Sequence, residues 1–198
     1  DKAKKTWYSY RKIYFYDTKL SLEQKDKCVE AFAGGYTHGN RFLKDTVLKN
    51  VLHVDFTSFY PSQLRTKKFP IGKPKELPSR WFKVNDLLDR CNDNDEIAVV
   101  DVLIADAELR NPDHPMPYLA SAKVKALDET RVIKDNGRIV KLEGLVKYTC
   151  TNKDLEIIKK QYKCKIKITA GIIFTSFPTN TNRGGDSILS PMCASLTR

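Results

Sequence analysis

The sequence predicts an α+β domain in which an antiparallel sheet carries helices on one face. Ile97–Ala105 is an apolar, β-branched run, and Lys165–Phe174 begins with alternating polar and apolar residues, so both segments predict strands. Asn136-Gly137 between two short β-prone runs is the strongest short signal for a hairpin. Helical patterns separate these strands, and 198 residues are enough to bury a core.

In the first half of the chain, the pattern predicts a helix, a strand and a second helix. Ser21 is placed to cap a helix that follows it. The apolar run Val47–Phe56 predicts a strand with Asp55 at its carboxyl end, and a short helix over residues 61–64 follows, with proline in its first turn. Lys67–Pro78 is rich in Lys and Pro and predicts an extended basic connector.

In the second half, local signals set most of the element boundaries. A helix is predicted over Val84–Cys91, before the strand that begins at Ile97. The hairpin pairs residues 131–133 with residues 138–142. Thr151 with Asp154 has the spacing of a helix N-cap, and the helix leads into the strand at Lys165.

The charge balance favours an anionic partner. Lys and Arg total 35 against 24 Asp and Glu, a formal net charge of +11. Nucleic acid is the commonest such partner, although membrane surfaces and acidic proteins attract basic domains as well. No apolar stretch approaches the roughly 20 residues that cross a bilayer, so we expect no membrane partner. Five scattered cysteines without a Cys-x-x-Cys pair indicate ordinary thiols in a reducing cytoplasm and argue against a zinc site.

The segment from Val54 to Ser62 is the most specific in the chain. A carboxylate, Asp55, leaves a predicted strand into a tight turn, and an aromatic residue starts the next helix. This geometry can hold a divalent cation and a polyphosphate together, because Mg²⁺ prefers oxygen ligands and phosphate prefers amide donors. The alternative is a structural corner in which the aspartate only caps the helix.

The residues Asp-x-x-Ser-Phe-Tyr-Pro, beginning at Asp55, resemble the first catalytic motif of family B DNA polymerases, which is usually Asp-x-x-Ser-Leu-Tyr-Pro. The resemblance implies that Asp55 and the carbonyl of Phe56 are metal ligands. It also implies that Ser58 and Phe59 form the turn that meets the nucleoside triphosphate. Tyr60 would then be the steric gate that excludes a ribose 2′-hydroxyl.

A second resemblance lies upstream, where Phe32-Ala33-Gly34-Gly35 is similar to the Tyr-x-Gly-Gly motif of protein-primed members of the family. Phenylalanine here replaces the tyrosine. Because glycine has no side chain, a template phosphate can approach the backbone closely there. Together with the basic connector, this motif defines the expected DNA-binding residues, which are Gly34, Gly35, Lys67, Lys68, Lys73 and Lys75.

The order of the remaining segments also follows the protein-primed branch, which phages and linear mobile elements carry. It implies a palm-like antiparallel sheet with an inserted small α/β subdomain. Residues 1–66 would hold the pre-palm segment and the first catalytic motif. Residues 67–150 would form the insertion that contacts a terminal protein and the upstream duplex, and residues 151–198 would return to the palm.

The family's second motif, Lys-x-x-x-Asn-Ser-x-Tyr-Gly, and its third, Asp-Thr-Asp, do not occur in the sequence. We therefore expect a part of a DNA-directed DNA polymerase that is inactive alone. The intact enzyme would use Mg²⁺, template-primer DNA, deoxynucleotides and a terminal-protein primer in the host cytoplasm. The alternatives are a non-catalytic binding module built on a palm remnant, and an unrelated basic RNA-binding domain.

Overall fold

The computed structural model describes residues 20–32, 39–66, 73–127 and 130–175. The chain divides into two compact units. One contains residues 22–47 and 75–173, and is called here the sheet unit. The other contains residues 1–21, 48–74 and 174–198, and is called the motif unit.

The described helices are short, and the strands are of very unequal length. The helices and 3₁₀ turns are α2 (Leu22–Ala31), η2 (Arg41–Leu43), α3 (Phe59–Thr66), η3 (Ser79–Trp81), α4 (Val84–Asp93) and α5 (Asn152–Gln161). The strands are β1 (Lys75–Glu76), β2 (Ile97–Leu109), β3 (Lys125–Ala126), β4 (Arg131–Asp135), β5 (Arg138–Glu143), β6 (Leu145–Thr151) and β7 (Tyr162–Phe174). Within the described ranges, no helix is long and apolar enough to span a membrane.

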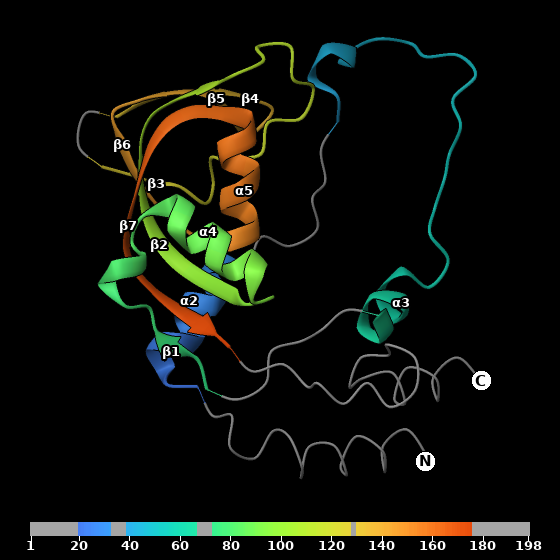
Figure 1. Cartoon of the computed structure of the whole chain (residues 1–198). Helices are drawn as coiled ribbons and strands as arrows, with labels where there is room; N and C mark the ends of the chain where they lie inside the picture. The colour runs from blue at the N-terminus through green and yellow to red at the C-terminus, as the bar shows by residue number, and fades with distance from the viewer. Residues whose placement is uncertain (1–19, 33–38, 67–72, 128–129, 176–198) are drawn as a thin grey trace. The chain divides into compact units, whose positions relative to one another are not determined.

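The sheet unit is built around one antiparallel sheet, whose order is β1-β7-β2-β5-β4 (Figure 1). Strand β6 pairs with both β2 and β3. The register between β2 and β6 runs from Val99 opposite Thr151 to Ala105 opposite Leu145. The predicted strands at Ile97 and Lys165 are confirmed as parts of β2 and β7, and the α+β fold class is confirmed with them.

One face of the sheet forms the core with α4 and α5, which lie in front of the strands in Figure 1. Along β2, residues 98, 100, 102 and 104 are fully buried. Helix α4 contributes Leu87, Leu88 and Cys91, and α5 contributes Leu155 and Ile158. Full burial of each Val, Leu or Ile side chain among them stabilises the fold by about 1.5–3 kcal/mol. The predicted packing of helices on one face of the sheet is confirmed for α4 and α5.

The opposite face carries α2, which the prediction did not place there. The Lys27 ammonium lies 3.1 Å from Asp101 Oδ2, with both side chains largely buried. The Thr149 hydroxyl donates to Asp101 Oδ1 at 2.7 Å, and Thr149 stands opposite Asp101 in the register. Because successive side chains of β2 alternate between faces, Asp101 points away from the core formed with α4 and α5. The ion pair between Lys27 and Asp101 thus fastens α2 to the second face.

The hairpin and the helix cap predicted from local signals are both confirmed. Strands β4 and β5 pair around Asn136 and Gly137, whose φ values of 46° and 74° are those of a primed turn. At α5, the Thr151 side chain accepts from the Asp154 amide, and the Asp154 carboxylate accepts from the Thr151 amide. This reciprocal capping box satisfies two amides that the helix leaves unpaired.

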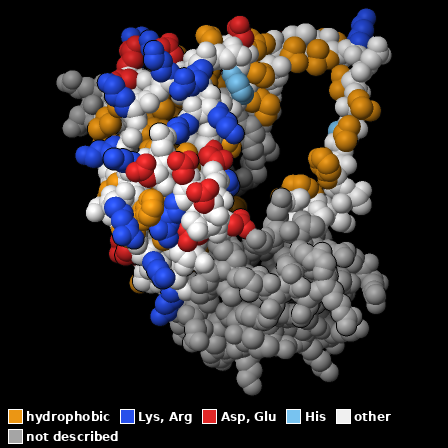
Figure 2. Space-filling model, in the orientation of Figure 1, with side chains coloured by type: hydrophobic (Ala, Val, Ile, Leu, Met, Phe, Trp, Pro, Cys, Tyr) orange, Lys and Arg blue, Asp and Glu red, His pale blue; other side chains and the backbone are white. Residues whose placement is uncertain are grey.

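The predicted strand over Val47–Phe56 is wrong. The structure assigns no strand from residue 44 to residue 58, and the apolar side chains of this segment are 51–87% exposed. Orange spheres mark them in Figure 2 along the extended stretch that precedes α3. A strand is stable only when it pairs with another, and no strand in the described parts of the chain pairs with this segment. The β-prone composition of this segment is therefore not enough to form a strand without a partner strand.

The carboxyl end of the basic connector becomes part of the sheet. Lys75 and Glu76 form β1, in register with Ile173 and Ile172 of β7. The Leu77 amide continues this pairing by donating to the Gly171 carbonyl at 2.9 Å. A Cβ at Gly171 would lie 2.8 Å from Val100 Cγ1 and 3.0 Å from the Val99 carbonyl, so the close approach of β7 and β2 requires glycine there.

Candidate functional site

The turn before α3 carries the predicted catalytic aspartate. Asp55 is exposed, and its Oδ1 accepts a hydrogen bond from the Phe56 amide at 2.9 Å. Ser58 adopts a positive φ of 51°, a conformation that is uncommon outside glycine. Its carbonyl accepts from the Ser62 amide at 3.0 Å, which begins the hydrogen-bonding of α3. The sequence thus makes a tight turn that leaves a carboxylate exposed beside a helix start.

Three aromatic side chains surround this turn. Phe56 and Tyr60 are 73% and 77% exposed, and Phe59 is 47% exposed. The ring centroids of Phe56 and Phe59 are 5.8 Å apart, and those of Phe59 and Tyr60 are 5.9 Å apart in an edge-on arrangement. Aromatic rings in contact are normally part of a core, whereas these rings are accessible to a ligand. The structure therefore brings the predicted residues from Asp55 to Tyr60 together in one short segment.

A divalent metal ion needs several oxygen ligands. Asp55 offers one carboxylate, and the Phe56 carbonyl is next to it in the chain. Across the described residues, no three His, Cys, Asp or Glu side chains are grouped so that they could hold a metal ion. The donors have the right chemistry for Mg²⁺ but are too few for a pair of ions. No catalytic step through a metal follows from these residues alone.

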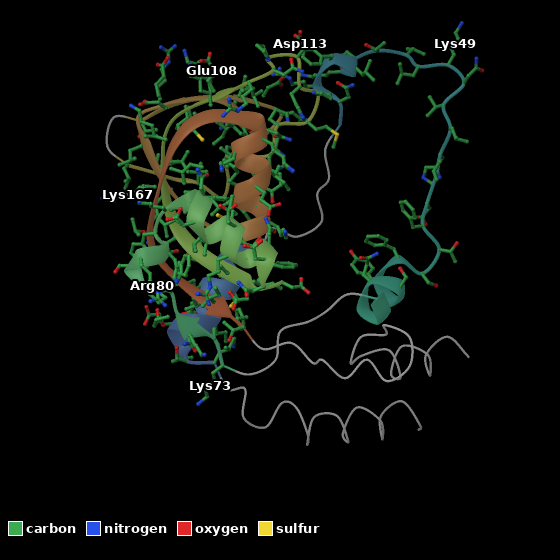
Figure 3. All side chains as sticks on the ribbon, in the orientation of Figure 1. Lys49, Lys73, Arg80, Glu108, Asp113 and Lys167 are labelled. Atoms are coloured by element: carbon green, nitrogen blue, oxygen red, sulfur yellow. The ribbon has the colours of Figure 1, made fainter. Side chains whose placement is uncertain are left out.

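The predicted DNA-binding residues are only partly within the described ranges. Lys73 and Lys75 are exposed, and Figure 3 shows the Lys73 side chain pointing outward. Lys73 belongs to the motif unit and Lys75 to the sheet unit. Gly34, Gly35, Lys67 and Lys68 lie outside the described residues. The DNA-binding role of all six residues stays a prediction.

The structure also reveals a basic pocket that sequence reasoning missed. It has a volume of about 290 Å³ and lies in the sheet unit between α2, the turn before β3, and β6. Its lining includes three lysines, Lys123, Lys125 and Lys147. Part of the signal is present in the sequence, because Lys123 and Lys125 form a Lys-x-Lys pattern that runs into β3. Lys147 comes from β6, and only the pairing of β3 with β6 brings it to the pocket.

One carboxylate, that of Glu30, reaches the pocket. Its hydrogen bond from Lys125, at 3.0 Å, is the main cause that holds the pKa of Glu30 below its usual value, and the bond from Thr149 adds to this effect. The Lys123 ammonium donates to the Phe32 carbonyl just beyond the carboxyl end of α2. A cation at this position is favourable because the end of a helix carries partial negative charge.

The chain has the fold of part of a DNA polymerase. It resembles Phi29 DNA polymerase complexed with primer-template DNA and incoming nucleotide substrates, with a TM-score of 0.63 at 16% identity, over 98% of this chain and 31% of that chain. Phi29 DNA polymerase complexed with single-stranded DNA gives a TM-score of 0.59 at 15% identity, over 98% of this chain and 30% of that one. The chain therefore spans less than a third of the polymerases that it matches.

The particular family follows from the sequence. Residues 3–182 match the family described as DNA polymerase type B, organellar and viral. Because this match covers most of the 198 residues, the chain belongs to that family. Comparison with curated proteins finds no match. The prediction that the chain is part of a family B DNA polymerase is confirmed.

Proposed function

We propose that this chain is the part of a DNA-directed DNA polymerase that carries one of two metal-binding carboxylates, Asp55. The observation that carries the proposal is the turn before α3, which exposes Asp55 and Tyr60 on one short segment in a chain of this family. The reaction of the longer enzyme is attack of a primer hydroxyl on the α-phosphate of a deoxynucleoside triphosphate, which forms a phosphodiester bond and releases pyrophosphate. The match to Phi29 DNA polymerase, described with DNA and nucleotide, supports these two partners.

Each residue of the turn receives a separate role. The Asp55 carboxylate and the Phe56 carbonyl are oxygen ligands for Mg²⁺, and the longer enzyme supplies the second carboxylate. Ser58 and Phe59 shape the turn against the nucleoside triphosphate. Tyr60 presents its ring to the sugar. Mg²⁺ held by Asp55 and the Phe56 carbonyl, together with the second carboxylate of the longer enzyme, would supply activation of the attacking hydroxyl and stabilisation of the leaving group.

The wider assignments belong to the same proposal. Gly34, Gly35 and the connector lysines bind the template-primer, and residues 67–150 form the insertion that meets a terminal-protein primer and the upstream duplex. Residues 1–66 hold the pre-palm segment and the first catalytic motif of the palm, and residues 151–198 return to the palm. The family includes organellar and viral enzymes, and we place this one in the cytoplasm of a host cell.

The direct test is nucleotide incorporation by the longer enzyme with Asp55→Ala. We expect incorporation to fall by at least about 10³-fold while template-primer affinity changes by less than about threefold, because the carboxylate acts on the metal ions more than on the duplex. Asp89→Ala is the matched control, since Asp89 is an exposed residue of α4. Equal loss of incorporation and of DNA binding in the Asp55 variant would contradict the assignment.

The second candidate is a non-catalytic binding module that retains the palm fold. One observation favours this candidate. Within the described residues, Asp55 is the one carboxylate at the α3 turn, and no group of three potential metal ligands is present. The 198-residue chain should show no Mg²⁺-dependent incorporation under either hypothesis. Primer extension by the longer enzyme distinguishes the two candidates. The longer enzyme extends a primer if this chain is part of a polymerase, and it does not if the chain is a non-catalytic binding module.

A further inference from the structure

The chain on either side of the glycine motif is fastened to the rest of the sheet unit. Upstream of Gly34 and Gly35, helix α2 ends at Ala31, and downstream of them η2 begins at Arg41. Each side is held by the side chain of one cationic residue, which is Lys123 on the upstream side and Arg41 on the downstream side. The two attachments can therefore be removed one at a time by substitution.

The upstream anchor is Lys123, in the turn before β3. Its half-buried side chain donates to the Phe32 carbonyl, just beyond the last residue of α2, and lies 3.5 Å from the Glu30 carbonyl. Carbonyls at this end of a helix have no partner within the helix. A lysine satisfies them and also matches the partial negative charge of the helix end. Lys123 therefore fixes the place at which the chain leaves α2.

The body of α2 is held to the sheet independently of Lys123. Lys27 pairs with Asp101 of β2 at 3.1 Å, and both side chains are largely buried. Glu30 pairs with Lys125 of β3 at 3.0 Å, where both side chains are about half exposed, so this second pair contributes less. A change at Lys123 should therefore leave α2 in place and release only its last carbonyls.

The downstream anchor is Arg41, at the start of η2. Its guanidinium donates to the Pro112 carbonyl and lies 3.8 Å from Asp135 Oδ2, and the side chain is only 9% exposed. The Arg41 amide donates to the Pro115 carbonyl at 3.4 Å. Pro112 and Pro115 belong to the proline-rich turn, and Asp135 is the last residue of β4. Arg41 therefore fixes the chain against two separate parts of the sheet unit.

The stretch between the two anchors is short. Eight residues, 33–40, separate Phe32 from Arg41. A chain segment whose two ends are fixed has fewer conformations than one with a free end. It therefore loses less entropy when a ligand orders it, and this preorganisation raises affinity without any new contact to the ligand. Release of either anchor should weaken binding to the segment.

We propose that Lys123 and Arg41 are positioning residues for template-primer binding, because they hold the two ends of the segment that carries Gly34 and Gly35. The inference rests on the proposed function, which takes these glycines as DNA-binding residues. It adds two residues that act through the glycine segment and do not contact DNA themselves. Lys123 and the residues that Arg41 contacts all lie within 67–150, so the proposed insertion sets the position of the glycine motif.

The test measures the affinity of the longer enzyme for a fluorescent template-primer over a range of salt concentrations. Lys123→Met keeps the alkyl stem and removes the donor, and we expect it to weaken binding about five- to tenfold. The slope of log K against log salt should stay nearly the same, whereas a lysine that binds a phosphate directly would lower it by about 0.9 when removed. Lys123→Arg keeps a cationic donor and should restore binding to within about twofold.

Coupling to the glycine motif is the sharper readout. Gly34→Ala/Gly35→Ala should weaken binding, and Lys123→Met added to this variant should weaken it by less than about twofold more, because the anchor then has no competent segment to position. Arg41→Met should behave in the same way. Lys83→Met removes one charge from an exposed position next to α4 and is the matched control. It should leave the affinity and the salt slope nearly unchanged in both backgrounds.

Hydrogen exchange in the 198-residue chain checks the upstream anchor itself. The Phe32 amide donates to the carbonyls of Cys28 and Val29, so its exchange reports on the last turn of α2. Lys123→Met should speed this exchange by at least about threefold while the amides of β2 exchange at their original rates. Faster exchange throughout β2 would mean a general loss of stability and would contradict a local anchor.

The binding results separate this inference from the proposed function. Equal weakening by Lys123→Met in both backgrounds, or a slope lowered by about 0.9, would mean direct contact with DNA and would overturn the inference. Unchanged affinity in Lys123→Met and Arg41→Met, with weak binding by the glycine variant, would overturn the inference alone. Unchanged affinity in the glycine variant would contradict the DNA-binding part of the proposed function and this inference with it. Nucleotide incorporation by Asp55→Ala judges the catalytic part separately.

Discussion

At the scale of single residues, Asp55 and Tyr60 lie on either side of one turn, and the proposed function gives them different tasks. Ser58, at a φ of 51°, separates the exposed carboxylate from the start of α3. Strained backbone of this kind is common at functional sites. Because the two side chains do not depend on a buried core, their replacement should change function more than folding.

Tyr60→Val in the longer enzyme should leave deoxynucleotide incorporation measurable and relax the rejection of ribonucleotides. Only a shape contact to the sugar is lost, so we expect a change in selectivity of roughly 10–200-fold. The ratio of kcat/KM for a deoxynucleotide to kcat/KM for the ribonucleotide with the same base measures this selectivity. Tyr60→Phe keeps the ring and is the control, with selectivity preserved. Unchanged selectivity in Tyr60→Val would contradict the role of a steric gate.

The residues of the α3 turn could be predicted because they are consecutive in the sequence. The pocket lysines could not, because Lys123 and Lys125 are separated from Lys147 by more than twenty residues. Only the pairing of β3 with β6 brings them together. Sequence patterns report contacts along a helix or strand, whereas this site depends on which strands are neighbours.

At the scale of elements, predictions held where the signal was local. The turn at Asn136-Gly137 and the cap at Thr151 need only a few adjacent residues, and both formed as expected. The strand predicted over Val47–Phe56 failed because it required a partner strand that local composition does not supply. Helix α2 was predicted, but its position on the second face depends on Asp101 and Thr149, which are distant in the chain.

The attachment of α2 should depend on pH through Glu30. The hydrogen bond from Lys125, with a further one from Thr149, lowers the pKa of this carboxyl in the folded state. A lowered folded-state pKa means that the stabilisation is present above the unfolded value of about 4.3 and is lost as the pH falls through the folded value. Because both partners are about half exposed, the effect should be at most about 1 kcal/mol.

Thermal unfolding between pH 7 and pH 3 measures this contribution. The melting temperature of Glu30→Gln should fall less on acidification than that of the unmodified chain. Glu23→Gln, at an exposed position in the first turn of α2, is the control and should follow the unmodified chain. Identical pH profiles for all three proteins would show that Glu30 does not hold α2 to the sheet.

At the scale of the whole molecule, the chain combines a sheet unit with an unbalanced basic pocket and a motif unit with an exposed carboxylate. It spans less than a third of the polymerases with the same fold. Two-metal catalysis needs carboxylates that bridge ions about 3.5–4 Å apart, and Asp55 is one such group. The central claim is therefore that Asp55 contacts a metal ion in the longer enzyme.

Asp55→Cys in the longer enzyme, assayed with Mg²⁺ and then with Mn²⁺, tests this claim most directly. A thiolate is a poor ligand for Mg²⁺ and a better one for softer ions. We predict that primer extension by Asp55→Cys is lost with Mg²⁺ and recovers by at least about tenfold with Mn²⁺, while Asp55→Ala stays inactive with both ions. Equal activity of the Cys and Ala variants with Mn²⁺, or full activity of either variant with Mg²⁺, would contradict the claim that Asp55 contacts a metal ion.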